Sequence, residues 1–136
     1  MNLSNNEVLI TGGGSGIGLG LAEIFLSAGS RVIICGRRKE ALEGARRKNP
    51  GLVTFPCDLA REDERIRLAE WLAREHPTVN VLVNNAGIQQ RMNFSQADFW
   101  QRARQEMAIN WEAPVHLTVL LVDMLKKAPS ASILNV

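Results

Sequence analysis

The sequence predicts an α/β fold in which helices cover both faces of a doubly wound parallel sheet. Short apolar runs alternate with segments of helical periodicity along the whole chain, and this alternation is typical of strands joined by crossover helices. The apolar runs show no polar alternation, which indicates strands that are buried on both faces, as in parallel sheets. Right-handed crossovers between such strands favour a Rossmann-like topology.

Each expected element is bounded by residues that begin or end regular structure. We expect strands over residues 7–11, 31–35, 52–55, 79–84 and 132–136, and helices over residues 17–28, 38–48, 61–74 and 95–127. Gly29 and the run Asn49-Pro50-Gly51 are placed to end the first two helices. Ser95, with Asp98 three residues later, is typical of a capping box at the start of the last helical region.

Length and composition limit the class of protein. The chain has 136 residues, 22% of them charged, with a net charge of +2, so we expect one domain, or part of one, over residues 1–136. The absence of a sustained charge block argues against a nucleic-acid partner. No apolar run is long enough for a membrane span and the N-terminus lacks signal-peptide features, so we expect a cytoplasmic protein with no membrane partner. Cys35 and Cys57 each end an apolar run and are expected to be buried structural residues.

Residues 12–20 contain six glycines and lead directly into the first amphipathic helix. A glycine-rich turn between a strand and a helix leaves unpaired N–H groups and the positive end of the helix dipole directed at one point. This arrangement suits a phosphate group. The alternative is a merely flexible loop, but such loops rarely lie between a buried strand and an amphipathic helix.

The spacing of the glycines distinguishes among phosphate-binding loops. Neither GxxxxGK[ST] nor GxGxxG fits from any of these glycines. Residues 11–18 are TGGGSGIG, or TGxxxGxG, and this pattern resembles the short-chain dehydrogenase/reductase family. Two further motifs of the family are present: Asn84-Asn85-Ala86-Gly87 follows the fourth expected strand, and Asp58-Leu59 follows the third.

The resemblance implies an oxidoreductase that uses NADP or NAD, bound at the carboxyl ends of the strands. In the family, the residue that matches Asp58 contacts the adenine ring; taken alone, Asp58 could equally cap a neighbouring helix. The stretch from Asn84 to Gly87 could likewise be an ordinary turn. The residues that the resemblance assigns to cofactor binding, together with the arginines discussed next, are Thr11, Gly12, Gly14, Ser15, Gly16, Ile17, Gly18, Arg37, Arg38, Asp58, Leu59, Asn85, Ala86 and Gly87.

The residues after the second expected strand bear on the choice of cofactor. An NAD-preferring protein usually has an acidic residue there to bind the ribose hydroxyls, whereas this chain has Cys35-Gly36-Arg37-Arg38. The guanidinium groups favour NADP over NAD, because arginine pairs with phosphate oxygens through a fork of donors. This preference rests mainly on Arg37. The alternative is that Arg38 and Lys39 form only the solvated first turn of a helix.

Asn110 is the candidate catalytic residue. Pro114 lies four residues after it within an expected helix, and because proline has no N–H, the carbonyl of Asn110 loses its usual helical partner. In the family, the matching asparagine kinks this helix and its main chain holds a water in a proton relay to the catalytic lysine. An ordinary proline kink is the alternative.

The resemblance ends before the family's other catalytic residues. The family's reaction needs a tyrosine as general acid/base, a lysine four residues later and a serine that holds the substrate oxygen, yet the chain contains no tyrosine. Residues 133–136 match the strand that normally leads into that serine. We therefore expect the cofactor-binding portion of an oxidoreductase that moves a hydride between nicotinamide and a carbonyl or alcohol substrate, truncated after the fifth strand and inactive alone. A non-enzymatic dinucleotide-binding or interaction module is the alternative.

The remaining polar residues suggest no other catalytic group. We expect His76 in a surface turn and His116 as a core histidine of the long helix. Asp98, Glu106 and Glu112 are expected to be exposed helical charge, and no Cys/His cluster has metal-ligand spacing, so no metal site is expected. The apolar fifth strand has no charge, proline or bulge to protect its edge, which predicts a homo-oligomer.

Overall fold

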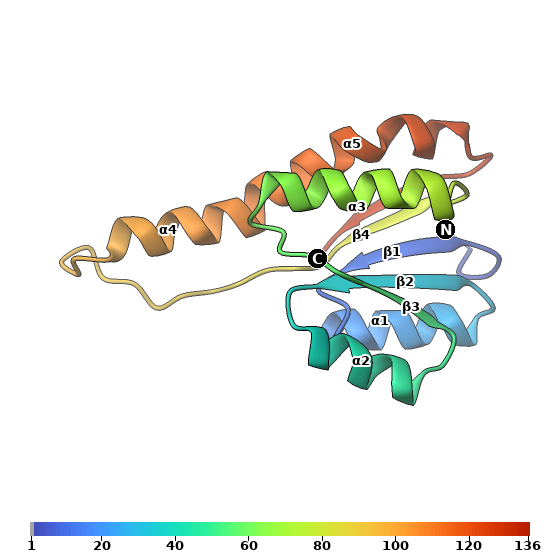
Figure 1. The fold of residues 1–136 in the computed structure, drawn as a ribbon, viewed down its shortest axis with the longest axis horizontal. Coiled ribbons are helices and arrows are strands. Elements are labelled where there is room, and N and C mark those ends of the chain that lie inside the picture. Colours follow the sequence, from blue (N-terminus) through green and yellow to red (C-terminus); the bar gives the residue numbers. More distant parts are fainter. Residues whose placement is uncertain (1) are drawn as a thin grey trace.

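The computed structural model describes residues 2–136, in which strands and helices alternate as expected (Figure 1). The strands are β1 (Glu7–Thr11), β2 (Arg31–Gly36), β3 (Leu52–Pro56), β4 (Val81–Asn84) and β5 (Ser132–Asn135). The helices are α1 (Gly16–Ser27), α2 (Lys39–Lys48), α3 (Glu62–Glu75), α4 (Phe99–Met107) and α5 (Ala113–Lys127), with a π-helical turn η1 (Ala108–Glu112) between the last two.

All neighbouring strands pair in parallel, in the order β3-β2-β1-β4-β5. The chain moves outward from β1 to β3 and then crosses back to place β4 on the other side of β1. Figure 1 shows α1 and α2 on one face of the sheet and α3 and α5 on the other. The doubly wound parallel sheet is therefore confirmed, and its strand order reverses between β1 and β4, where such sheets bind ligands at their carboxyl edge.

Side chains that alternate along the strands fill two separate cores. From β1, Leu9 joins a cluster that includes Leu117 of α5. Its neighbours Val8 and Ile10 join the opposite cluster, which includes Phe25 of α1. Both faces of the sheet are apolar for this reason, which explains why the strands show no polar alternation in the sequence.

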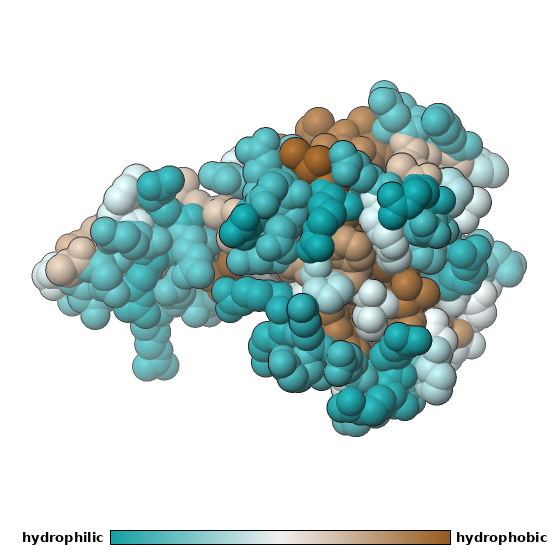
Figure 2. Space-filling view, viewed as in Figure 1, coloured by the Kyte–Doolittle hydropathy of each residue, from teal (hydrophilic) through white to brown (hydrophobic). Residues whose placement is uncertain are grey.

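Strand β3 forms one edge of the sheet and is partly protected by α3. The ring centroids of Phe55 and Trp71 lie 4.7 Å apart, and the guanidinium carbon of Arg67 lies 5.1 Å from the centroid of Phe55. Figure 2 shows hydrophobic residues around this strand, between hydrophilic surfaces on α2 and α3. The stem and charged head of an arginine over an aromatic ring reduce the apolar area that meets water.

The last helical region differs from the expectation in two ways. It begins at Phe99, and Ser95 forms no capping box, because its N–H, which the side chain of Asp98 would accept, donates to Oδ1 of Asn93 instead. It is also not one continuous helix, since η1 separates α4 from α5 and the N–H of Ala113 bonds to the carbonyl of Ala108, five residues earlier. Figure 1 shows α4 projecting away from the sheet.

A buried carboxylate holds the amino ends of the strands together. Glu7 of β1 is buried and accepts a hydrogen bond from the hydroxyl of Thr78, while Nη2 of Arg31 lies 2.7 Å from its Oε1. Nδ1 of His76 lies 2.8 Å from the same oxygen, and the side chain of His76 is only 12% exposed. His76 ends α3 over this carboxylate, so its side chain is mostly buried and not part of an open surface turn.

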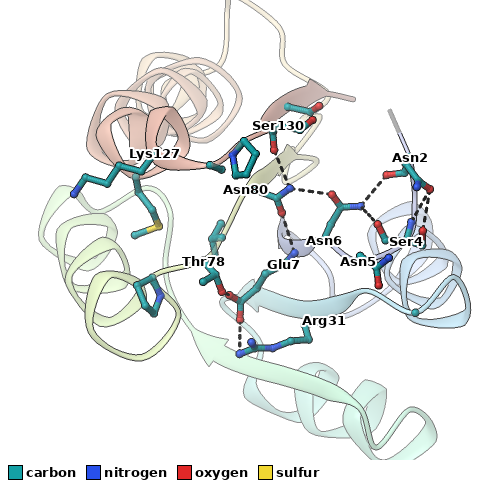
Figure 3. Close-up of a pocket in the computed structure, with 17 residues that line it drawn as sticks. Asn2, Ser4, Asn5, Asn6, Glu7, Arg31, Thr78, Asn80, Lys127 and Ser130 are labelled. Carbon is teal, nitrogen blue, oxygen red and sulfur yellow. Dashed lines mark hydrogen bonds and ion pairs between the residues drawn. The ribbon is translucent and has the colours of Figure 1, made fainter.

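Figure 3 shows the cavity of about 680 Å³ beside this carboxylate. Asn80 accepts a hydrogen bond from the N–H of Glu7 and donates to Oδ1 of Asn6 and to the carbonyl of Ser130. These polar groups bond to one another across the cavity wall. We therefore assign them to holding the N-terminal segment against β4 and β5.

Gly18 and Gly20 provide a matched test of how α1 packs on the sheet. A Cβ at Gly18 would overlap Nδ2 of Asn85 and lie 2.5 Å from the carbonyl oxygen of Gly12, whereas a Cβ at Gly20 meets nothing within 4 Å. We expect Gly18→Ala to lower the free energy of unfolding by about 1–3 kcal/mol through overpacking. Gly20→Ala should raise it by about 0.5–1 kcal/mol through helix propensity. Urea unfolding followed by circular dichroism measures both, and equal effects would contradict the packing argument.

Candidate functional site

The candidate site lies at the carboxyl ends of β1 to β4, where sequence analysis placed it. A cavity of about 340 Å³ opens there between the glycine-rich turn, the end of β2, the segment after β3 and the segment after β4. Its lining residues are Gly12, Ser15, Ile17, Gly36, Arg37, Arg38, Cys57, Leu59, Asn85, Ala86, Gly87 and Ile109. Nine of these twelve are residues that the sequence assigned to the site, and the others are Gly36, Cys57 and Ile109.

The glycine-rich turn presents a run of free backbone donors. The N–H groups of Gly12 and Gly13 both donate to the carbonyl of Cys35. The next five N–H groups, from Gly14 to Gly18, bond to no acceptor within residues 2–136. They lie at the start of α1, whose N-cap, Ser15, makes no side-chain capping bond. Adjacent free amides and the positive end of the helix dipole together attract an anion.

The glycines of this turn are needed for different reasons. Gly12 and Gly16 have φ of 67° and 56°, in the left-handed region that L side chains avoid. A Cβ at Gly13 would overlap the side chain of Ile34 in β2, and Gly18 is equally close to Asn85. Gly13 was not among the residues assigned from the sequence, because its role is to pack against the protein itself.

Thr11 and Asn85 join the two strands that flank the site. The hydroxyl of Thr11 donates to the carbonyl of Val83 at 3.3 Å and accepts the N–H groups of Asn85 and Ala86, each at 3.0 Å. Nδ2 of Asn85 donates to the carbonyl of Thr11 at 3.0 Å. Thr11 is 2% exposed and does not line the cavity itself. Its hydrogen bonds instead hold the segment after β4, which forms one cavity wall, against the end of β1.

Two arginines stand at the mouth of the cavity beside the free amides. Nη2 of Arg38 donates to Oγ of Ser15 at 2.9 Å, which holds that guanidinium across the mouth. Both Arg37 and Arg38 are exposed, and neither pairs with a carboxylate among the residues that the structure describes. A second anion could therefore bind here without displacing an ion pair.

The segment after β3 forms the opposite wall. Oδ1 of Asp58 accepts the N–H of Ala60 at 3.1 Å, and the N–H of Asp58 donates to Oε2 of Glu64 at 2.7 Å. The N-cap of α3 is Arg61, so Asp58 stabilises the turn before the helix and is not its cap. Leu59 follows it, buried against the cavity.

Asn110 lies in η1 and is bound to the segment after β4. Its Oδ1 accepts the N–H of Ile88 at 2.9 Å, and its Nδ2 donates to the carbonyl of Ile88 at 2.7 Å. It lines a second cavity, of about 600 Å³, together with Gly87 and Trp111. Sequence analysis found the proline without an N–H at residue 114, but not the wide turn that accommodates it.

The other polar candidates take structural positions. His116 is hydrogen-bonded as expected, since its Nδ1 accepts a hydrogen bond from Nε of Arg65 at 3.0 Å, but it is half-buried and lies outside the core. Asp98 and Glu112 are exposed as expected. Glu106 is half-buried, contrary to expectation, because its Oε2 accepts the N–H of Gln90 at 2.9 Å.

Residues 2–136 contain neither a metal-binding cluster nor a membrane-spanning helix. No group of three or more His, Cys, Asp or Glu side chains is arranged to hold a metal ion. No helix in the same range combines the length and the apolar character needed to cross a bilayer.

A doubly wound parallel sheet with free amides at the start of its first helix is the arrangement of nucleotide-binding α/β proteins. A family profile described as short chain dehydrogenase matches residues 6–136. The chain belongs to this family.

The relatives are longer than this chain. An uncharacterized oxidoreductase, DltE of Bacillus subtilis, is 44% identical over 137 residues, covering 100% of this chain and 54% of the relative. L-fucose dehydrogenase of Bos taurus is 31% identical over 121 residues, covering 89% and 45% respectively. The chain therefore spans about half the length of the curated relatives it matches.

Solved structures share the fold over almost the whole chain. The Pseudomonas aeruginosa RhlG/NADP active-site complex has a TM-score of 0.87 and 29% identity, covering 98% of this chain and 55% of that one. A metagenomic short-chain oxidoreductase in complex with NADP has a TM-score of 0.85 and 27% identity, covering 99% and 63%.

The two buried thiols give a pH-dependent prediction. Burial, with a smaller contribution from the carboxylate of Glu64, raises the pKa of Cys57 from 9.0 to about 12, and burial also raises the pKa of Cys35. The unfolded chain therefore loses these protons at lower pH than the folded chain. The stability that these groups contribute is complete below pH 9.0 and is lost as the pH rises towards about 12.

We expect iodoacetamide to leave both thiols unmodified in the folded chain at about pH 8, because the thiolate is the reactive form. Both should react in urea, and mass spectrometry of the labelled chain distinguishes the two states. Rapid labelling of the folded chain would show that Cys57 is accessible from the cavity it lines.

Proposed function

We propose that this chain forms the NADP(H)-binding portion of a short-chain oxidoreductase that acts on a carbonyl or alcohol substrate. The observation that carries the proposal is the run of five free N–H groups, Gly14 to Gly18, at the N-terminus of α1. A pyrophosphate satisfies such donors without any charged side chain.

The residues around the cavity fit the other parts of a dinucleotide. Arg38, held by Ser15, would bind a 2′-phosphate together with Arg37. Leu59 would form the adenine end together with its neighbour Asp58, which does not itself line the cavity, and the segment from Asn85 to Gly87 would form the nicotinamide end. When bound, the nicotinamide ring supplies or accepts a hydride.

Asn110 would act in the proton path through its main-chain carbonyl, not through its side chain. Its side-chain amide already bonds to both backbone groups of Ile88, and its carbonyl has no α-helical donor, because Pro114 lacks an N–H. We assign this carbonyl to holding a water in the proton path, as the family resemblance implies. The general acid/base of the family is a tyrosine and residues 1–136 contain none, so we propose that this chain binds the dinucleotide without turning substrate over.

Two of the similar structures support NADP, because both are described as complexes with it. The basic end of β2 gives the same preference, since an acidic residue there would repel a 2′-phosphate. A cytoplasmic location and the absence of a nucleic-acid partner stay predictions from the sequence.

Calorimetric titration of the 136-residue chain with NADPH and with NADH tests the cofactor. We expect NADPH to bind more tightly. Arg37→Gln and Arg38→Gln should each weaken NADPH binding about tenfold, because hydrogen bonds between charged groups contribute about 1.5–3 kcal/mol. NADH binding should change little.

The matched control is Arg47→Gln, which removes an exposed arginine from the last turn of α2, away from the cavity. It should leave both affinities unchanged. Tighter binding of NADH than of NADPH would contradict the assignment of the two arginines. Binding of neither dinucleotide would contradict the proposed function.

We also propose that copies of this chain self-associate through β5. This strand ends the sheet, and Ile133 and Val136 are 42% and 65% exposed. An edge strand with open backbone groups and apolar side chains pairs readily with another strand. Sedimentation velocity at tens of micromolar should show dimers or larger species, and a monomer at that concentration would exclude this contact.

A further inference from the structure

Arg65 is a buried arginine that the proposed function leaves unexplained. It lies within α3 and is 4% exposed, and it forms no ion pair with a carboxylate in the described part of the chain, residues 2–136. A guanidinium stays protonated in proteins, so burying it without a counter-ion is unfavourable. An apolar side chain of similar size would fill the same space between α3 and α5 without that cost. The guanidinium therefore needs a reason other than packing.

Its hydrogen bonds join two parts of the molecule that belong to the site. Nη1 donates to the carbonyl of Leu59 at 2.6 Å, and Nε donates to Nδ1 of His116 at 3.0 Å. Leu59 belongs to the cavity wall after β3. His116 belongs to α5, which continues from the turn that carries Asn110. A ring nitrogen that accepts this bond carries no proton, so the proton of a neutral His116 lies on Nε2.

Two neighbouring side chains of α3, Glu64 and Arg65, thus bond to the backbone of two neighbouring residues in the turn after β3. Glu64 accepts the N–H of Asp58, and Arg65 donates to the carbonyl of Leu59. The planar fork of a guanidinium fixes the direction of an acceptor as well as its distance. His116 holds the other side of that fork against α5.

We propose that Arg65 is a positioning residue for the adenine side of the dinucleotide site, acting through the carbonyl of Leu59 and anchored by His116. This inference rests on the proposed function and extends it to residues that do not touch the cavity. The buried guanidinium would keep Leu59, and with it the cavity wall after β3, in place before a ligand binds.

Arg65→Met tests the inference because it keeps the unbranched stem and removes every donor. The matched control is Arg74→Met, the same change on the same helix at a side chain that is 70% exposed and pairs only with Glu75. Calorimetry measures the affinity for NADPH and for adenosine 2′,5′-bisphosphate, which probes the adenine side alone. Measurements are made well below the melting temperature of each variant, with folding checked by circular dichroism.

We expect Arg65→Met to weaken binding of both probes about tenfold, since a buried carbonyl loses its partner, and Arg74→Met to change neither affinity. Arg65→Lys keeps a charged donor that can reach one acceptor, so it should recover part of the loss. His116→Leu should weaken binding less than Arg65→Met does. In the Arg65→Met background it should add nothing, because both changes break the same connection.

A folded Arg65→Met chain that binds both probes as the wild type does would overturn the inference and leave the proposed function intact. A loss of affinity that Arg65→Lys does not reduce would also overturn it, since the donor would then be irrelevant. If Arg65→Met does not fold, unchanged affinity in both Arg65→Lys and His116→Leu overturns it. A wild-type chain that binds neither probe would instead overturn the proposed function, and this inference with it.

Discussion

The site depends on how closely the backbone of α1 approaches the ends of β1 and β4. Gly18 meets the carbonyl of Gly12 and the amide of Asn85 at distances that exclude any side chain, and Gly13 meets Ile34 in the same way. These contacts fix the first turn of the helix against the sheet. The amides from Gly14 to Gly18 are left without partners at the start of α1, where Ser15 and Ile17 line the cavity. The proposed anion site would therefore be formed by backbone packing, before any ligand is present.

The hydrogen bonds of Thr11 and Asn85 extend this arrangement to the neighbouring strand. Thr11 bonds to the backbone on both sides of the end of β4, and Asn85 bonds back to β1. Since the sheet reverses its strand order between β1 and β4, no crossover connection closes the structure at that point. Side-chain hydrogen bonds hold the two strand ends together instead, and the cavity opens directly above them.

Much of the fold and of the site could be predicted because the signals are local. The apolar runs gave the strands, and the glycine spacing gave the turn before α1. Features set by distant residues could not be found in this way. His76 bonds to Glu7, which is 69 residues away in the sequence, and Arg65 occupies a buried position of α3 whose acceptors lie outside that helix.

Two expectations from local sequence were wrong, because each local pattern is compatible with more than one structure. Ser95 has a capping sequence, but its N–H donates to Asn93 and not to Asp98, and the helix begins four residues later. Pro114 removes an N–H from the helix, and a kink or a wider turn can each accommodate that loss. The sequence does not distinguish these two solutions, and the structure contains the wider turn at η1.

The π-helical turn η1 also constrains the number of residues between α4 and the buried leucines of α5. One α-helical residue corresponds to a rotation of about 100°, so adding a single residue between Ala108 and Glu112 would rotate everything that follows unless the turn widened further. Leu117, Leu121 and Leu125 would then turn away from the sheet they now cover. An insertion here would therefore require a differently packed α5, whereas a deletion of one residue can be absorbed when η1 closes to an α-helical turn.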